Sequence, residues 1–236
     1  MAQDSQRGIS VIIPTLNEAE NISRLIPRLA RVFSALQRPY EILIADGGST
    51  DGTQEIARQL AVQAPVRLVE AMSGRGLAGD VLCAAQQGRG TVTVVMDADL
   101  SHPPEIAPVL AEAVLTGKAD VAVGSRYVTG GSTPDWSWMR RVMSRCAGWL
   151  ARPRMTIGDP TAGFFAVERE RLLKVDRRVA GFKILLEIIL GSPAPLRVLE
   201  IPICFRERTL GKSKMSLKQG YLYLRQLARL QGLLGR

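Results

Sequence analysis

The sequence predicts an α/β fold with a doubly wound, mainly parallel sheet and flanking helices. Short runs rich in β-branched residues alternate with segments of helical periodicity along the first half of the chain. Polar clusters follow these runs, and the carboxyl edge of a parallel sheet is where such folds bind ligands. The chain has 236 residues, 46% of them hydrophobic, which is enough for one large domain with a full core.

The expected strands follow one another at 10–14, 41–46, 66–70, 91–97 and 120–125. Helical segments are expected between them, at 18–33, 53–64 and 103–116. The last of these begins with prolines, which favour a first helical turn. A later strand is expected in the segment G-F-F-A-V, 163–167.

The charge balance indicates an anionic partner. Lys and Arg total 31 against 22 acidic residues, a formal charge of +9. Aromatic residues make up 5% of the chain, and no zinc-finger spacing or aromatic RNA-binding strand is present, so we expect no nucleic acid as partner. Three widely spaced cysteines favour a reducing cytosol, and no signal peptide or spanning segment is apparent, which predicts a soluble or peripheral protein.

Two aspartates stand where the expected strand 91–97 ends. The stretch V-V-M-D-A-D-L-S-H-P-P-E, 94–105, contains Asp97 and Asp99. Convergent carboxylates bind hard divalent cations. The alternative is an Asx-turn in which Asp99 accepts local amide hydrogens. No Walker lysine loop or G-x-G-x-x-G opens the first helix, so neither of these nucleotide-binding motifs applies.

Further motifs occur in a recognisable order: V-I-I-P-T-L-N-E-A-E-N, I-A-D-G-G-S-T-D-G-T, M-D-A-D-L-S-H-P-P-E, V-G-S-R-Y-V-T-G-G, D-P-T-A-G-F-F-A and E-I-P-I-C-F-R-E-R-T-L-G-K-S-K. Together they resemble the family 2 glycosyltransferases of the Rossmann-like GT-A fold, and most closely the dolichol-phosphate (polyprenol-phosphate) mannosyltransferases. The resemblance implies an inverting enzyme that transfers mannose from GDP-mannose to a polyprenol phosphate such as dolichyl phosphate. It implies a flexible N-terminus at 1–8, a glycosyltransferase domain at 9–216 and a C-terminal amphipathic basic helix at 217–236.

The resemblance also implies a donor site. Asp97 and Asp99, with Ala98 between them, would hold Mg²⁺ or Mn²⁺ against the diphosphate, and Ser101 is a candidate third ligand in place of the common Gln. Asp46 matches the acid that contacts the base, followed by Gly47 where a second Asp is common. Positions that line the base and ribose match Pro14, Leu16, Glu18 and Ile44. For Glu18 the alternative is an ordinary acid in a first helical turn.

Basic residues match the diphosphate and acceptor sites of the family. Arg206 and Lys212 match a loop that closes on the diphosphate, where cations stabilise a leaving group that gains charge. The alternative is a solvated basic loop. Arg126, Arg140 and Ser144 match positions that bind the lipid phosphate, and Arg126 is also assigned to the sugar-nucleotide site.

A lipid phosphate needs no general base, because a phosphate monoester is largely ionised near neutral pH. Its attack would invert an α-linked donor to a β-linked product. A hydroxyl acceptor would need a base, and Asp159 in D-P-T-A-G-F is the candidate. The alternative for Asp159 is to cap the turn before the strand 163–167. We interpret His102, the only histidine, as structural.

The tryptophans Trp136, Trp138 and Trp149 are interleaved with arginines, which suits a membrane interface or a packed helix with a basic outer face. In the last helix a basic stripe of Lys218, Arg225, Arg229 and Arg236 lies opposite an apolar one of Tyr223, Leu227, Leu230 and Leu234. Three arrangements of this helix are open: it lies on an anionic leaflet, it packs on the domain, or it binds a membrane partner. We expect peripheral attachment at the cytosolic face, with a small membrane-spanning subunit or a downstream lipid-sugar-using transferase as further partner.

Rival functions remain open at this point. One is a glucosyltransferase that takes UDP-glucose as donor for polyprenol phosphate. Another is a family 2 transferase that acts on a sugar hydroxyl with Asp159 as base. A third is a non-catalytic basic protein that binds nucleic acid or acidic lipids.

Overall fold

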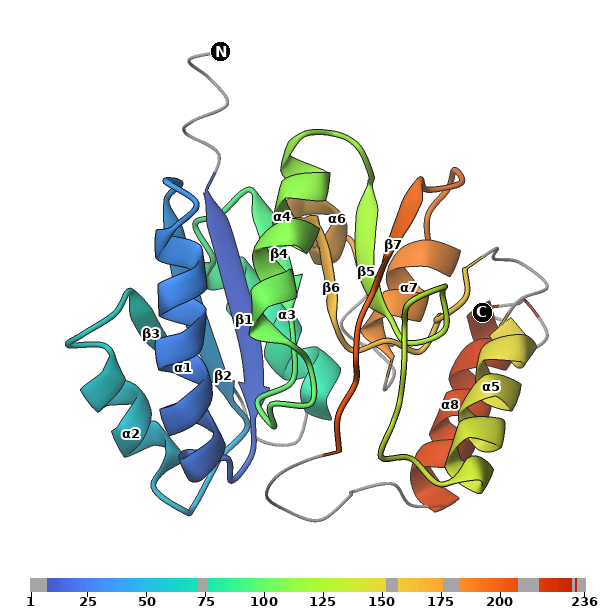
Figure 1. The fold of residues 1–236 in the computed structure, drawn as a ribbon, viewed down its shortest axis with the longest axis horizontal. Coiled ribbons are helices and arrows are strands. Elements are labelled where there is room, and N and C mark those ends of the chain that lie inside the picture. The colour runs from blue at the N-terminus through green and yellow to red at the C-terminus, as the bar shows by residue number, and fades with distance from the viewer. Residues whose placement is uncertain are drawn as a thin grey trace.

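The computed structural model describes residues 8–71, 76–151, 157–175, 183–207, 217–230 and 232. These residues form one sheet with strand order β3-β2-β1-β4-β6-β5-β7 (Figure 1). The strands are β1 Ile9–Thr15, β2 Tyr40–Asp46, β3 Val66–Glu70, β4 Val92–Val95, β5 Val121–Ser125, β6 Phe165–Glu168 and β7 Val198–Pro202. Strand β6 runs antiparallel to β4 and β5, and the other pairs are parallel, so the mainly parallel sheet is confirmed.

Helices cover both faces of the sheet (Figure 1). The helical elements are α1 Ala19–Ser34, α2 Thr53–Leu60, α3 Gly76–Gln87, the 3₁₀ turn η2 Pro104–Ile106, α4 Ala107–Leu115, α5 Trp138–Ala151, α6 Arg169–Leu173, α7 Ile184–Leu190 and α8 Leu217–Leu230. One core cluster joins the sheet to α1, α2 and α4, and a second joins it to α3, α6 and α7. Successive buried side chains of β1 and β2 point to opposite faces of the sheet, so they contribute alternately to the two cores.

Several expected elements differ from the structure in their bounds. The expected strand 91–97 ends at Val95, because its pairing with β1 stops at Ile12 and the chain then turns. The expected helix 53–64 ends at Leu60. The segment 103–116 begins as the turn η2 and only then becomes α4.

Among the elements that the sequence reading missed are α3 and β7. Helix α3 is rich in small residues and buried around much of its circumference, so it lacks the apolar stripe that marks a surface helix. Strand β7 lies at the sheet edge, beside β5 only, and none of its residues is fully buried. Neither element shows the periodicity that identified the others.

Helix α8 packs on the domain through the apolar side predicted for it. Tyr223 and Leu227 are buried with residues of α5 and α7, and the Tyr223 hydroxyl donates to the Ala147 carbonyl at 2.5 Å. Gln226 exchanges two hydrogen bonds with the backbone of Lys183, and Arg229 pairs with Glu187. Packing on the domain is therefore confirmed for this side of α8. The side chain of Lys218, as well as Leu234 and Arg236, lie outside the described residues.

No described helix combines the length and the apolar character needed to cross a bilayer.

Gly90 lets the turn before β4 approach β1 closely. A Cβ at this position would lie 2.4 Å from the Ser10 backbone nitrogen, which no side-chain rotation can relieve. We expect Gly90→Ala to lower the free energy of unfolding by about 1–3 kcal/mol. The matched control is Gly220→Ala in α8, where nothing lies within 4 Å. That variant is expected to gain up to about 1 kcal/mol from helix propensity. Urea unfolding measures both, and equal stabilities would contradict the close approach.

Candidate functional site

The loops that carry the predicted site meet at one edge of the sheet. Strands β1, β2 and β4 are parallel neighbours, and β5 runs in the same direction because β6 is antiparallel to both β4 and β5. Their carboxyl ends therefore lie on one side, at the lower edge of the sheet in Figure 1. The predicted convergence of the polar loops is confirmed.

The loop after β4 presents Asp97 partly exposed and Asp99 almost fully buried. One oxygen of Asp99 accepts the Ser101 N–H at 3.1 Å and the Ser101 hydroxyl at 2.6 Å, so the Asx-turn interpretation holds for that oxygen. Leu100, between them, has a φ of 60°, which is uncommon for a branched side chain. Backbone strain of this kind concentrates at functional sites.

The Asp97 carboxylate lies against the loop that precedes β6. A Cβ at Gly163 would lie 3.3 Å from Asp97 Oδ2, so a glycine allows this approach. The Asp97 N–H donates to His102 Nδ1 at 3.4 Å, and the His102 ring stacks on Phe164. Burial lowers the pKa of His102, which keeps the imidazole neutral. These contacts fit the structural role expected for this histidine.

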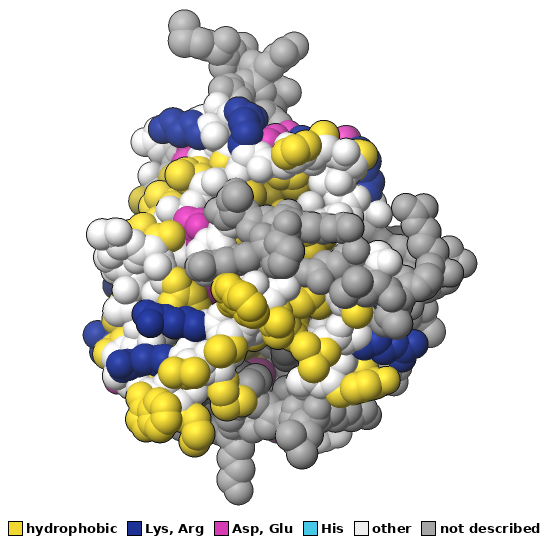
Figure 2. All heavy atoms as spheres, turned by 90° about the vertical axis from the view of Figure 1, so that its right-hand side faces the viewer, with side chains coloured by type: hydrophobic (Ala, Val, Ile, Leu, Met, Phe, Trp, Pro, Cys, Tyr) yellow, Lys and Arg dark blue, Asp and Glu magenta, His cyan; other side chains and the backbone are white. Residues whose placement is uncertain are grey.

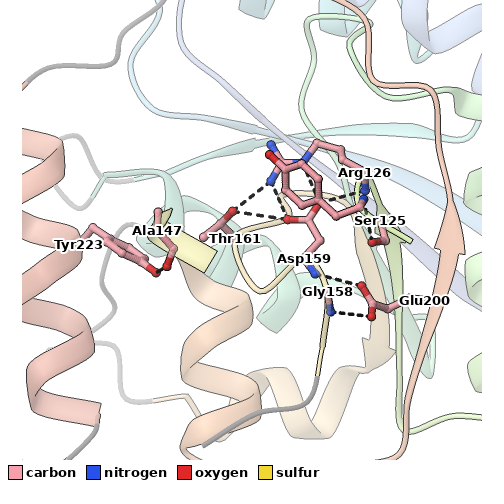
Figure 3. Close-up of polar contacts among 9 residues, drawn as sticks. Ser125, Arg126, Ala147, Gly158, Asp159, Thr161, Glu200 and Tyr223 are labelled. Carbon is pink, nitrogen blue, oxygen red and sulfur yellow. Dashed lines mark hydrogen bonds and ion pairs between the residues drawn. The ribbon is translucent and has the colours of Figure 1, made fainter. Parts of the chain in front are cut away.

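A buried ion pair joins Arg126, after β5, to Asp159, before β6 (Figure 3). The Arg126 side chain donates to the two Asp159 oxygens at 2.7 and 2.6 Å, and the Arg126 backbone N–H donates at 3.0 Å. The amides of Gly158 and Asp159 donate to Glu200 of β7. Asp159 is fully buried and both its oxygens are engaged, which favours the turn-stabilising interpretation over a general base.

A hollow of about 250 Å³ opens beside Arg126. Arg141 and Arg145 of α5 line it together with Tyr127 and the segment 131–134. Sequence reasoning missed these two arginines, although their i, i+4 spacing places them on one face of a helix. The predicted Arg140 instead stacks on Trp136, 4.2 Å from its ring centre, and pairs with Glu207. The predicted Ser144 lies one helical turn beyond Arg140.

The predicted base contact Asp46 is fully buried, and its carboxylate accepts five hydrogen bonds from Thr15, Gly48, Ser49 and Gln54. These bonds lower the pKa of Asp46 although burial alone would raise it. In this arrangement Asp46 organises its own loop.

The other predicted donor-site residues occupy different depths. Leu16 is 44% exposed at the sheet edge, whereas Pro14, Ile44 and Ala98 are buried. Glu18 immediately precedes α1 and accepts a hydrogen bond from Asn21 at 2.6 Å, which is close to the ordinary role at a helix start that was its alternative.

Arg206 lies beside the aspartate loop, since its backbone N–H donates to the Ser101 carbonyl at 3.2 Å. Its side chain is exposed. Lys212 lies outside the described residues. The loop that carries Arg206 is therefore next to the two aspartates, as expected of a loop that faces the diphosphate.

Two further residues at this edge had no signal in the sequence. Lys183 is half-buried, and burial followed by the charge of Arg126 lowers its pKa, while Asp97 and Asp159 act in the opposite direction. Asp80 of α3 lies next to Gly47. Both residues reach the edge from elements on the second face of the sheet, which sequence spacing alone does not place.

The paired charge of Arg126 should matter more than that of an exposed arginine with the same contacts. The side chain of Arg197 also donates hydrogen bonds from two nitrogens to an aspartate, Asp120, but it is 64% exposed. We expect Arg126→Lys to lower the free energy of unfolding by about 2–4 kcal/mol and Arg197→Lys by less than about 1 kcal/mol. Urea unfolding compares the two, and similar losses would show that burial of the pair contributes nothing.

A family model and many curated proteins match the chain. The model "Glycosyl transferase family 2" matches residues 10–176. The dolichol-phosphate mannosyltransferase of Pyrococcus furiosus is 41% identical over 94% of this chain and 63% of its own length. The dolichol-phosphate mannosyltransferase of Saccharomyces cerevisiae is 37% identical over 94% of this chain and 86% of that protein. The polyprenol monophosphomannose synthase of Mycolicibacterium smegmatis is 42% identical over 87% of this chain and 80% of that protein.

Solved structures share the fold. Mannosyl-3-phosphoglycerate synthase from Rubrobacter xylanophilus superposes with a TM-score of 0.73 at 19% identity, over 98% of this chain and 77% of that one. Glucosyl-3-phosphoglycerate synthase from Mycobacterium tuberculosis, in complex with Mn²⁺, UDP-glucose and phosphoglyceric acid, gives 0.71 at 20% identity, over 98% and 82%. The GT-A fold predicted from the sequence is thereby confirmed. The chain belongs to the family 2 glycosyltransferases.

Proposed function

We propose that this protein transfers mannose from GDP-mannose to a polyprenol phosphate such as dolichyl phosphate, giving polyprenyl phosphate β-mannose. The observation that carries the proposal is the identity of 37–42% to three proteins named for dolichol-phosphate or polyprenol mannose transfer, over 87–94% of this chain. The chain spans 63% of the length of the Pyrococcus furiosus relative, so assigning the activity of that relative to this chain is a proposal. The site geometry supports it at three points.

Asp97 and Asp99 would hold a divalent cation, Mg²⁺ or Mn²⁺, with Ser101 close by. Carboxylate and hydroxyl oxygens are the ligands these hard cations prefer. Gly163 leaves space beside this carboxylate, because a Cβ there would lie 3.3 Å from Asp97 Oδ2 and would press on it. Within the described ranges no three His, Cys, Asp or Glu side chains converge, so further ligands would come from water or the donor. The ion would neutralise charge on the diphosphate.

The acceptor phosphate fits the basic hollow beside Arg126. Arg141 and Arg145 bring two cations to it, and Arg126 stacks near Trp136 and Tyr127. An ionised phosphate oxygen would bond to the anomeric carbon as the bond to GDP breaks, and GDP leaves with the electron pair. No proton has to be removed in this step. The engagement of Asp159 with Arg126 favours this acceptor over a sugar hydroxyl, and Arg206 would stabilise the departing diphosphate together with Lys212.

A transfer assay with labelled sugar tests the proposal. GDP-mannose and UDP-glucose are compared with a short polyprenyl phosphate, Mg²⁺ or Mn²⁺, and a chelator control. We expect a mannolipid from GDP-mannose that requires the metal, and at least a roughly 10²-fold lower rate for Asp99→Asn. Glu55→Gln, an exposed acid on α2, serves as the matched control and should retain full activity. If only UDP-glucose gives product, the donor is UDP-glucose and not GDP-mannose. If the protein binds GDP but forms no product, polyprenyl phosphate is not the acceptor.

The protein would contact the membrane that holds its lipid substrate through a surface formed by α5 and α8. Figure 2 shows hydrophobic side chains beside Lys and Arg on this side of the molecule. The exposed apolar residues are Trp138, Met139, Val142, Met143, Trp149 and Leu150 of α5, with Tyr221, Leu222 and Leu224 of α8. Such a patch with aromatic and basic residues suits a headgroup layer. Since α5 also lines the hollow, the lipid phosphate would reach Arg126 while its chain stays in the bilayer.

On this proposal the protein is peripheral at a cytosol-facing membrane, and a small membrane-spanning subunit would bind the same face. Within α8 the apolar residues available for the membrane are Tyr221, Leu222 and Leu224, because Tyr223 and Leu227 pack inward.

Removing the exposed indoles tests the membrane surface. Trp138 is 75% exposed and Trp149 is 67% exposed. We expect the double variant Trp138→Ser, Trp149→Ser to bind vesicles of phosphatidylcholine and phosphatidylglycerol at least about tenfold more weakly, because less apolar area enters the interface. The control is Val62→Ser, which is 85% exposed and follows α2. Cosedimentation measures both, and an unchanged double variant would exclude this face.

A further inference from the structure

Asp80 is a buried carboxylate at the nucleoside end of the site. It lies on α3, and only 7% of the residue is exposed. Among the described residues its carboxylate has neither a hydrogen-bond donor nor a cation as partner. Neither carboxylate oxygen is both buried and without a partner, so the carboxylate reaches water at this edge and is accessible to a ligand.

The carboxylate occupies space that exists because residue 47 is glycine. A Cβ at Gly47 would lie 2.9 Å from Asp80 Oδ2. The Gly47 N–H donates to the Thr15 carbonyl at 3.0 Å, which ties this loop to the end of β1. Asp80 therefore lies where β1 and β2 end, at the ligand edge. It comes from α3, whereas Asp46 is bonded to Gln54 of α2 on the other face of the sheet.

The neighbouring Asp46 offers little to a ligand. A carboxylate has about four lone-pair positions, and Asp46 already accepts five hydrogen bonds from its own surroundings. Donor groups of a nucleoside that enter this edge would find Asp46 occupied. The acceptor that remains beside it is Asp80.

We infer that Asp80 accepts the hydrogen bonds of the donor's nucleoside in this chain, a role that sequence reasoning assigned to Asp46. The inference rests on the proposed function, since it takes the substrate to be a sugar nucleotide. A carboxylate matches two parallel N–H groups, as on the edge of guanine, and it also accepts ribose hydroxyls. The N–H groups of guanine and the ribose hydroxyls are both hydrogen-bond donors of one nucleoside. Nucleotide analogues that lack one or the other distinguish the two contacts.

The state of Asp80 gives the inference a pH dependence. Burial, and then the charge of Asp46, raises the pKa of Asp80 to about 6. The charged groups on the other strands and helices around α3 are engaged elsewhere: Arg67 with Glu41, Glu70 with Arg58, and Arg169 with backbone carbonyls. Asp80 is thus mostly ionised at pH 7.5 and mostly protonated at pH 5.0. The ionised form accepts through both oxygens, so nucleotide affinity should rise between these values.

Calorimetric titration of the full chain with GDP and Mn²⁺ tests this at both pH values. The wild type should bind about tenfold more tightly at pH 7.5 than at pH 5.0. Asp80→Asn should bind about 10–100-fold more weakly at pH 7.5 and lose most of that difference. Glu55→Gln controls for a removed charge and should match the wild type. Inosine diphosphate lacks the guanine amino group and 2′-deoxy-GDP lacks a ribose hydroxyl, so the analogue that loses affinity in the wild type but not in Asp80→Asn names the contact.

Stability separates a binding role from a packing role. Because the folded state raises the pKa of Asp80, it binds a proton more tightly than the unfolded chain between about pH 4 and pH 6. Stability therefore falls as the pH rises through that window. Asp80→Asn removes this loss and should raise the melting temperature at pH 7.5, so weak binding by this variant is not misfolding.

The outcomes are distinct. Equal GDP affinity of Asp80→Asn and wild type at both pH values overturns the inference alone, as does a lowered melting temperature with unchanged pH dependence of binding. A wild type that binds neither GDP nor UDP overturns the proposed function and the inference with it.

Discussion

The ion pair between Arg126 and Asp159 connects the parts from which the site is built. Arg126 follows β5, Asp159 precedes β6, and the backbone of Asp159 is held by Glu200 of β7. One buried contact thus joins three adjacent strands at their ligand end. Because the guanidinium is neutralised there, it can also lie among the rings of Trp136 and Phe205, at the side of the basic hollow. An unpaired cation at this depth would be expelled towards water.

The location of the site was predictable, and the partners within it were less so. Parallel strands bring their carboxyl ends to one edge, so the aspartate loop and the loop of Asp46 could be placed together from their positions alone. The local contacts of Asp99 with Ser101 could also be anticipated, since Asx-turns involve near neighbours. By contrast, Arg126 and Asp159 are 33 residues apart, and no local rule pairs them. The sequence reading had placed these two residues in different roles.

The predictions and omissions within the site follow the same division. The sequence predicts Asp46 as a ligand contact because an acid at a strand end is typical of such contacts. In the structure its carboxylate accepts hydrogen bonds from residues two and three positions away, as is ordinary in turns. Asp80 carries no motif, and only the approach of α3 to Gly47 reveals it. Helix α3 itself was missed because its small buried residues form no apolar stripe. Two of the residues at this edge that the sequence overlooked, Asp80 and Lys183, thus come from the face of the sheet that carries α3 and α7.

The bond between α8 and the chain before α7 leaves one position of the site open to change. Gln226 binds the N–H and the carbonyl of Lys183 and makes no demand on its side chain. The side chain at 183 is the part that acts on Asp97 and Asp159. A substitution at position 183 would therefore change the charge beside the two aspartates while leaving the two backbone groups that bind Gln226 in place. The same residue thus links the docking of the last helix, through its backbone, to the charge at the ligand edge, through its side chain.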